Sequence, residues 1–464
     1  MSAAQMHAQA AALARSPWGT GAIAMGGALA IGLLAVSVPD VTIGLAMTPI
    51  VVTWLIYLLY QKVVRHPDAE FLLPNFRAGV ALRLVSVLAQ LAVGFLIYRG
   101  QMDYVSYVDK LVASAEQIVA NWEFARLLDP TFVQATFGGY SVLALFTLLG
   151  FMMLLVGPNI IAVFLIGAPM SAAAAYVFYR AYESVAPDAA SRRRFATLMF
   201  LFPSFVFWSV FLGKDVWIIL FLGCATLALI RVLEAVTPGR LLVLASCVYL
   251  VFLMRSHVGG PLALAVGAAL CFRQMPLRGP ALYLKPVLHV AVTPGGMLFV
   301  LYFVLLSALS HAGITSLNLD AIATRAYAAH IGFALTQGGA ALPQVMQEPT
   351  VSEALKFVPI GLATFFFRPF VWEAHNAIAF VSGVENLVFL GICIVRAPTL
   401  WQAIRRLRGS PFMVYLLVFI TLTSIALSFE WNLGATQRHR AMVLPFVFMV
   451  LALPMRRVPK DVPA

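Results

Sequence analysis

The chain has 464 residues, of which 62% are hydrophobic and only 11% are charged, and its mean hydropathy is +0.92. Soluble globular proteins carry about 25% charged residues, so this composition excludes a soluble domain and predicts a polytopic membrane protein. The net charge of +12 comes from basic residues scattered between apolar segments. That pattern is typical of loops that face anionic lipid, and no nucleic-acid partner is expected.

Apolar segments of about 20 residues, the length that crosses a bilayer, recur along the sequence. No internal repeat or soluble domain interrupts them, so residues 1–464 are predicted to form a single all-α membrane domain. No signal peptide is expected, because the N-terminal segment lacks a cleavage site. The predicted spans are 19–38, 43–60, 78–98, 138–179, 196–212, 215–232, 241–254, 259–272, 286–308, 377–395, 411–429 and 441–455.

Segment 138–179 is broken at Gly157-Pro158-Asn159, and we interpret it as two helices. The segments before and after it are nevertheless predicted to lie on opposite sides of the membrane, which requires an odd number of crossings. Either one half is re-entrant or a third crossing is hidden here, so the expected total is 11 to 13 spans. The four cysteines lie in apolar stretches without paired spacing, which is typical of small buried residues and not of disulfides or metal ligands; they are Cys224, Cys247, Cys271 and Cys393.

The distribution of basic residues predicts the orientation, because cytoplasmic loops are enriched in Lys and Arg. One set of loops holds 20 of the 31 basic residues but only 6 of the 19 acidic ones, so we assign it to the cytoplasm. Arg83 stands near the start of a predicted span, where it can snorkel to the interface. The cytoplasmic set comprises 1–18, 61–77, 180–195, 231–240, 273–285, 396–410 and 456–464.

Two longer segments fall on the opposite, outer side. Residues 99–137 are expected to form amphipathic pieces that lie along the membrane surface. Residues 309–376 are mixed, with a helix expected around 319–336 and an aromatic run from Phe365 to Glu373.

The basic residues of the outer side gather at the ends of predicted spans. Lys and Arg at one depth suit a phosphate or pyrophosphate, which Arg can bind with two parallel hydrogen bonds. The alternative is ordinary snorkelling or contact with lipid headgroups. The residues of this predicted anion site, with the side chains beside them, are Lys214, Asp215, Arg255, His257, Arg368, Trp372, Glu373, Arg438 and Arg440.

Acidic residues near the same surface suggest acid–base chemistry. Asp103 follows the third predicted span and could act as a general base toward a hydroxyl, although a solvated loop acid or a helix N-cap is an equal alternative. Glu373 and Glu430 could pair with arginines or bind a sugar. For Glu385, inside a predicted span, a structural ion pair is expected, and His289 is interpreted as a core histidine.

Several catalytic classes are excluded by missing motifs: there is no His-Glu-x-x-His, no Gly-x-Ser-x-Gly, no Walker loop and no Cys/His metal spacing. Three ordered motifs remain. They are Pro203-Ser204-x3-Trp208-Ser209-x4-Lys214-Asp215, Arg368-Pro369-Phe370-x-Trp372-Glu373 followed by Glu385-Asn386, and Gly434-x-Thr436-x-Arg438-x-Arg440-x4-Pro445.

In their order and shared sidedness, these motifs resemble those of bacterial surface-polysaccharide proteins, namely GT-C-class lipid-carrier-dependent glycosyltransferases and polysaccharide polymerases. The resemblance covers about residues 100 to 450. It implies an active site on the outer face of the bacterial inner membrane, with Asp103 as the base, although the usual Gly-Asp pair is Met102-Asp103 here. Lys214, Arg255, Arg438 and Arg440 would hold the donor phosphate.

The resemblance also implies partners: a polyprenyl-linked sugar donor, a glycan or lipid-linked acceptor, membrane lipids and other polysaccharide-assembly proteins. No cofactor is expected, and a divalent cation is left open. Two other functions stay open at this point, a flippase of lipid-linked oligosaccharide and a non-catalytic assembly scaffold. A flippase is disfavoured because such transporters are built from repeats with charged or broken helices at mid-membrane, and no repeat is evident.

Overall fold

The computed structural model describes residues 41–97, 99, 103–121, 123–186, 188–272, 319–334, 345–374, 377–405 and 410–454. This part of the chain is helical and contains no strand, as predicted. Its first half comprises α3 (Val41–Val64), α4 (Ala69–Ala92), η1 (Val93–Ile97), α5 (Asp103–Ala120), η2 (Glu123–Leu128), α6 (Pro130–Phe137), α7 (Tyr140–Val156), α8 (Ile160–Glu183), α9 (Ala189–Leu201), α10 (Pro203–Ser209) and α11 (Lys214–Glu234).

The second half of the described chain is also helical. It comprises α12 (Pro238–Met254), α13 (Ser256–Cys271), α15 (Leu319–Ala334), α16 (Val351–Phe367), η4 (Val371–Glu373), α17 (Ala377–Val395), α18 (Ala397–Arg405), α19 (Pro411–Ser428) and α20 (Leu433–Leu451). The predicted helix around 319–336 is confirmed as α15. The predicted spans 19–38 and 286–308, the latter with His289, lie outside the described residues.

Five described helices are long and apolar enough to cross a membrane, and the number rises to seven if each of two bent pairs is one span. The five are α3, α4 continued by η1, α8, α11 and α19. The bent pairs are α6 with α7, at 61°, and α17 with α18, at 53°, and α12 and α13 are shorter apolar helices. The predicted break at Gly157-Pro158-Asn159 is confirmed, because α7 ends at Val156 and Asn159 caps α8.

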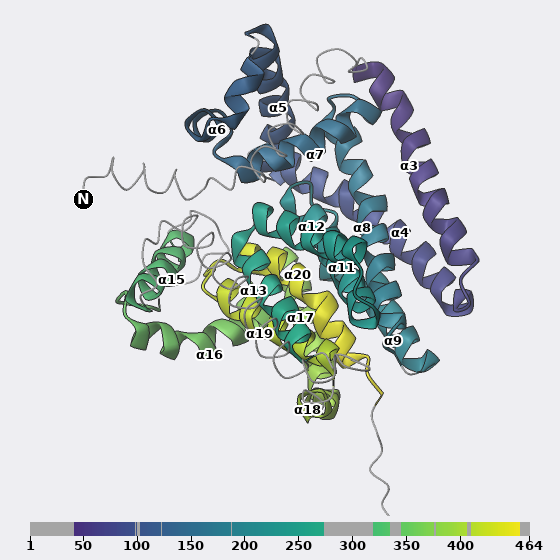
Figure 1. Cartoon of the computed structure of the whole chain (residues 1–464), viewed down its shortest axis with the longest axis vertical. Helices are drawn as coiled ribbons and strands as arrows, with labels where there is room; N and C mark the ends of the chain where they lie inside the picture. The colour runs from purple at the N-terminus through teal and green to yellow at the C-terminus, as the bar shows by residue number, and fades with distance from the viewer. Residues whose placement is uncertain are drawn as a thin grey trace, which may run out of the picture.

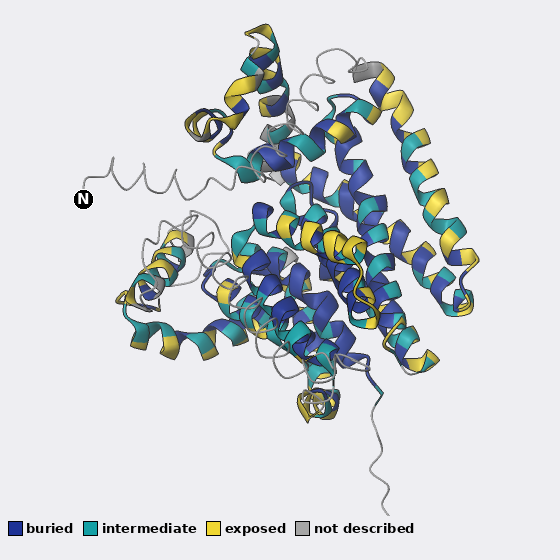
Figure 2. Cartoon of the chain, in the orientation of Figure 1, coloured by how far each residue is buried: buried dark blue, intermediate teal, exposed yellow. Residues whose placement is uncertain are grey.

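The helices pack into two adjoining groups (Figure 1). One apolar core joins α3, α4, α7 and α8 with α5 and α6, and the larger one joins α8, α9 and α11 with α12, α13, α19 and α20. Helix α20 lies in the centre of the second group and contacts α9, α10, α11, α16, α18 and α19. Helix α3 stands at the edge, and Figure 2 shows exposed residues along its length.

At the break between α9 and α10, polar side chains that are distant in the sequence hydrogen-bond to the backbone groups on both sides. Pro203 has no N–H, so the carbonyl of Met199 loses its normal helical donor four residues later. Arg83 supplies the replacement, because its Nη2 donates to Met199 O at 3.2 Å and its Nη1 to Phe200 O at 3.2 Å. On the other side, Glu385 accepts the N–H of Ser204 at 3.0 Å.

This geometry corrects the predicted role of Arg83. Helix α4 begins at Ala69, nine residues before the predicted span, so Arg83 lies mid-helix and is fully buried instead of snorkelling. Its Nε donates to Ser171 Oγ at 2.7 Å. The guanidinium thus serves backbone and hydroxyl acceptors inside the bundle.

Asp68 joins the start of α4 to α8 and α9. Its carboxylate accepts two hydrogen bonds from Arg192, at 2.7 and 2.9 Å, and one from the hydroxyl of Tyr179 at 2.5 Å. The hydrogen bond from Arg192 lowers the pKa of the Asp68 carboxyl below its usual 3.8, burial opposes this and Tyr179 adds to it. The paired carboxylate therefore stabilises the fold only while it is ionised.

Acidification should expose this contribution. Because the pKa of Asp68 is lowered in the folded protein, its stabilisation is complete above about pH 4 and is lost as the pH falls further. The thermal unfolding temperature of detergent-solubilised protein should fall more steeply between about pH 5 and pH 3 for the wild type than for Asp68→Asn. Equal slopes for the two proteins would contradict this role of Asp68.

Candidate functional site

Side chains at or near the amino-terminal ends of three helices meet in the interior. Lys214 and Asp215 are the first two residues of α11, Arg255 is the N-cap of α13, and Arg438 lies in the second turn of α20. Helices α11 and α13 have no side-chain hydrogen bond at their N-caps. A helix N-terminus carries about half a positive charge, so these helices add their positive ends to the basic side chains.

A buried carboxylate fixes two of the arginines. Asp215 is fully buried; its Oδ1 lies 3.1 Å from Arg255 Nη2, and its Oδ2 accepts from Arg438 Nε at 2.8 Å. The guanidinium of Arg438 also lies over the ring of Phe211, 3.9 Å from its centroid. These contacts hold both guanidinium groups in defined positions, because rotation of either would leave the buried carboxylate without its partner.

A second branch runs from Arg255 to Glu430. Arg255 Nη1 hydrogen-bonds to His439 Nε2, and His439 Nδ1 hydrogen-bonds to a carboxylate oxygen of Glu430. Because an arginine can only donate, Nε2 is the acceptor and the imidazole proton lies on Nδ1, directed at Glu430. Burial raises the pKa of Glu430, which lies in the turn before α20, but His439 and the nearby positive charges outweigh burial and lower it.

The group formed by Lys214, Asp215, Arg255, Glu430, Arg438 and His439, called the Asp215 cluster below, has a net positive charge. Three cationic side chains face two carboxylates, and the histidine is neutral in the arrangement above. Lys214 Nζ donates to Ser141 Oγ of α7 at 2.9 Å, which uses one of its three donors. The excess charge and the helix ends make this place suited to an anion.

His257 lies in the first turn of α13, close enough to Lys214, Arg255 and Glu430 to interact with them electrostatically. His257 lies at the surface of the described structure, whereas Asp215 is fully buried.

Arg440 belongs to a different place from Arg438. Successive helical residues are 100° apart, so side chains two residues apart point in nearly opposite directions. Arg440 is buried, and its Nη1 donates to Phe366 O at 2.6 Å and to Asn386 Oδ1 at 2.8 Å. It therefore holds α20 against α16 and α17, and these contacts do not bring it to the Asp215 cluster.

Arg368, Trp372 and Glu373 form a third group. Arg368 and Glu373 pair at 2.7 Å, and Glu373 also accepts the N–H of Phe370 at 2.8 Å. Trp372 is 74% exposed and stacks on Phe370 with ring centroids 4.8 Å apart. The guanidinium of Arg368 hydrogen-bonds to Glu373, and among the described residues no contact joins it to Asp215.

Four of the predicted residues, Lys214, Asp215, Arg255 and Arg438, therefore meet with His257 nearby, whereas Arg368, Trp372, Glu373 and Arg440 lie elsewhere. The side chain of Asp103 lies outside the described residues, although the residue begins α5. Sequence reasoning does not assign Ser141 or His439 to the site. His439 stands between the two arginines of a motif and could have been noticed, but nothing in the sequence indicates Ser141.

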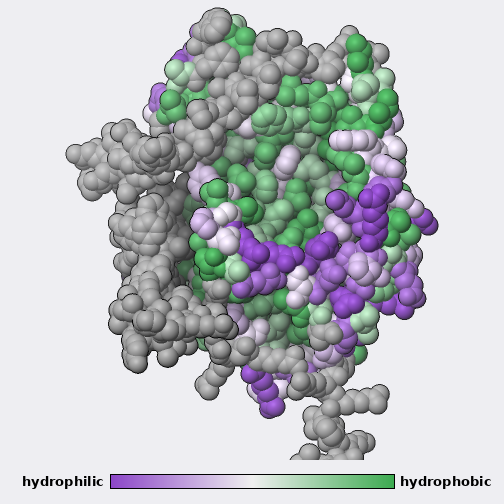
Figure 3. Space-filling model, turned by 45° about the vertical axis from the view of Figure 1, so that its right-hand side comes forward, coloured by the Kyte–Doolittle hydropathy of each residue, from purple (hydrophilic) through white to green (hydrophobic). Residues whose placement is uncertain are grey.

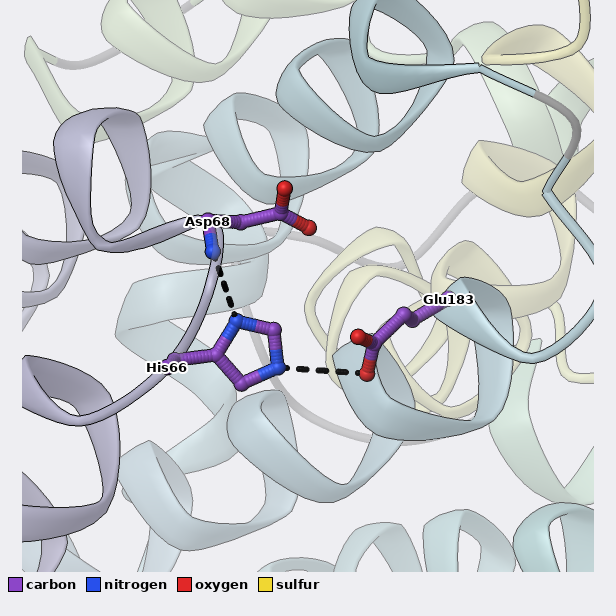
Figure 4. Close-up of side chains that lie close together, drawn as sticks. All are labelled: His66, Asp68 and Glu183. Atoms are coloured by element: carbon purple, nitrogen blue, oxygen red, sulfur yellow. Dashed lines mark hydrogen bonds and ion pairs between the residues drawn. The ribbon is translucent and has the colours of Figure 1, made fainter.

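One group of residues has the composition of a metal site. Ligand atoms of His66, Asp68 and Glu183 lie within 4.8 Å of one another. Figure 4 shows that the Asp68 carboxylate points away from the other two side chains, and it is already engaged by Arg192 and Tyr179. His66 Nδ1 accepts from Asp68 N at 3.1 Å, and Nε2 faces Glu183 at 3.2 Å. These side chains satisfy one another, so the geometry favours a structural link over a metal centre.

Comparison with protein-family models, curated proteins and solved structures gives no match for this chain. The functional argument therefore depends on the geometry of the Asp215 cluster.

Loss of the central carboxylate should be costly. Asp215→Asn leaves the charges of Arg255 and Arg438 uncompensated, and breaking a buried ion pair costs about 3–5 kcal/mol. The thermal unfolding temperature of the purified variant should fall well below that of the wild type. The matched control is Glu116→Gln, at an exposed position on α5.

Adding Arg438→Met to Asp215→Asn should recover part of the loss, because one unpaired charge is removed with its partner already gone. If the effects of the two substitutions on the unfolding temperature are additive, the charges are not coupled.

Proposed function

We propose that the Asp215 cluster binds the phosphate of a polyprenyl-linked sugar, and that the protein is a GT-C-like glycosyltransferase or polymerase of surface-polysaccharide assembly. The observation that carries the proposal is that residues from the starts of α11 and α13 and from the second turn of α20 form one cluster whose basic side chains outnumber its carboxylates. Helix N-termini bind phosphate through their N–H groups and dipoles, and Lys and Arg add charge-assisted hydrogen bonds.

The proposed orientation follows from the distribution of charge. With loops 61–77, 180–195 and 231–240 in the cytoplasm, the starts of α11, α13 and α20 face the periplasm. In this proposal the chain crosses the bacterial inner membrane 11 to 13 times. Five to seven helices of sufficient length among the described residues support a multi-pass protein.

In the proposed reaction, a hydroxyl of the acceptor attacks the anomeric carbon of the donor sugar. The new bond is the glycosidic C–O bond, and the bond that breaks joins the sugar carbon to the phosphate oxygen, which leaves with the electron pair. Lys214, Arg255 and Arg438 would neutralise the negative charge that grows on this oxygen. Asp103 stays the proposed acceptor of the hydroxyl proton.

The positions of the arginines support a division of labour. Asp215 orients Arg255 and Arg438 before any ligand arrives, and donors that are fixed in advance stabilise developing charge most effectively. Lys214 keeps two ammonium donors beyond its bond to Ser141, counting partners among the described residues. We therefore propose Lys214 and Arg438 as direct phosphate ligands and Arg440 as a structural residue.

Lys214→Met and Arg438→Met should each impair the transfer reaction. Removing one donor to a developing negative charge costs about 100-fold or more in rate. In the host strain, each variant should stay in the membrane, fail to make surface polysaccharide and accumulate polyprenyl-linked sugar. In lipid nanodiscs, native mass spectrometry should show polyprenyl phosphate bound to the wild type and much less to either variant.

Lys356→Met provides a matched control, because Lys356 is exposed and pairs only with its neighbour Glu353 among the described residues. Normal polysaccharide in both site variants would contradict the proposal. If the protein were a flippase, the two site substitutions would instead lower the amount of donor lipid in the outer leaflet. The accessibility of that lipid to a periplasmic probe measures this amount. Arg440→Met should reduce the amount of folded protein, in contrast to Lys214→Met, because Lys214 is hydrogen-bonded to a hydroxyl.

A further inference from the structure

A polar cavity lies where α3 and α8 end and α4 begins, and none of its lining residues belongs to the Asp215 cluster. Its volume is about 410 Å³, which lies within the range of pockets that bind small molecules. It is lined by Gln61, Lys62, Arg65, His66, Pro67, Tyr176, Arg180 and Glu183.

The charge of this cavity is predominantly positive. Among its lining residues, Glu183 is the one acid, and it is already engaged by Arg180 at 2.9 Å and by His66 at 3.2 Å. Lys62 and Arg65 are exposed and have no acidic partner among the described residues. Asp68 does not compensate them, because its carboxylate is paired with Arg192.

The carboxyl ends of α3 and α8 each add about half a negative charge here. Lys62 and Arg180, in the last turns of these helices, offset the two ends. Arg65 lies beyond the end of α3 at Val64, and its positive charge is not offset. A surplus of positive charge therefore remains after both the ion pair and the helix dipoles are counted.

The depth of the cavity indicates the kind of anion. It lies where three membrane-length helices end or begin, at Val64, Ala69 and Glu183, which is the level of lipid headgroups. Above it, α3 exposes apolar and aromatic side chains, including Tyr57 and Leu58. Figure 3 likewise shows large hydrophobic areas on the face it displays, with many of the hydrophilic residues across its middle and at its right-hand side.

We propose that this cavity binds a phosphate-bearing anion through Lys62 and Arg65. Its depth and the apolar side of α3 favour the headgroup of an acidic phospholipid, whose acyl chains would lie along that helix. Basic pockets between transmembrane helices on the cytoplasmic side bind such headgroups. The proposal is independent of the reaction at the Asp215 cluster.

The experiment uses the full-length protein in nanodiscs of phosphatidylcholine with or without 20 mol% phosphatidylglycerol. Native mass spectrometry should show phosphatidylglycerol retained by the wild type after removal from bulk lipid. The variant Lys62→Met/Arg65→Met should bind it about 30-fold more weakly, from the contribution of two basic residues near an anionic surface. Both positions are exposed, so the variant should fold.

The matched control is Arg231→Met/Arg240→Met. These two arginines lie in another predicted cytoplasmic loop and pair with Glu234, outside the cavity. A parallel titration of wild type and variants with inorganic phosphate, in phosphatidylcholine alone, distinguishes a lipid from a free anion.

Binding of either anion that is lost in Lys62→Met/Arg65→Met but kept in the control supports the proposal and identifies the source of the phosphate. Equal binding by the wild type and the cavity variant overturns it, as does an equal loss in the control. Absence of binding by the wild type in both arms also overturns it.

Discussion

The arrangement of the second group of helices, which surrounds α20, depends on the fully buried carboxylate of Asp215. An isolated carboxylate cannot remain ionised inside a bundle, so it must be accompanied by cations. Arg255 and Arg438 provide them from α13 and α20, whose starts are thereby held beside the start of α11. Three helices that are far apart in sequence are joined at one end by a single charge.

This arrangement also supports the proposal that the cluster binds a ligand. A buried ion pair contributes little to folding once its desolvation is counted. A cluster with more cations than carboxylates contributes still less, unless something else supplies negative charge. An ion pair between Asp215 and Arg255, followed by hydrogen bonds from Arg255 to His439 and from His439 to Glu430, fixes the orientation of each group. Fixed orientations of this kind are expected where hydrogen-bond donors are positioned before a ligand binds.

Much of the fold could be predicted from local pattern. The break at Gly157-Pro158-Asn159 follows from the conformational limits of those residues, and the helix at 319–334 follows from its composition. The starts of helices were less predictable. Helix α4 begins well before the apolar stretch that predicted it, because the turn at Asp68 is fixed by Arg192, a contact 124 residues away in the sequence.

The site was predictable only in part for the same reason. The distribution of basic residues among the loops predicted that Lys214, Arg255 and Arg438 lie on the outer side of the membrane. The structure brings these three residues together with Asp215. The separation of Arg438 from Arg440 follows from helical periodicity and could have been deduced. Ser141 could not be assigned, because its hydrogen bond to Lys214 leaves no pattern in the sequence, whereas His439 stands between the two arginines of a motif.

The burial of Arg83 has a consequence for biogenesis. An arginine at the centre of a lone helix would cost about 2.5–3.5 kcal/mol on insertion into a membrane. One acceptor of Arg83 is Gly79 O of α4 itself, but the others belong to α8 and α9, made about a hundred residues later. Helix α4 therefore reaches its lowest free energy only after α8 and α9 have packed against it, which couples the assembly of these three helices.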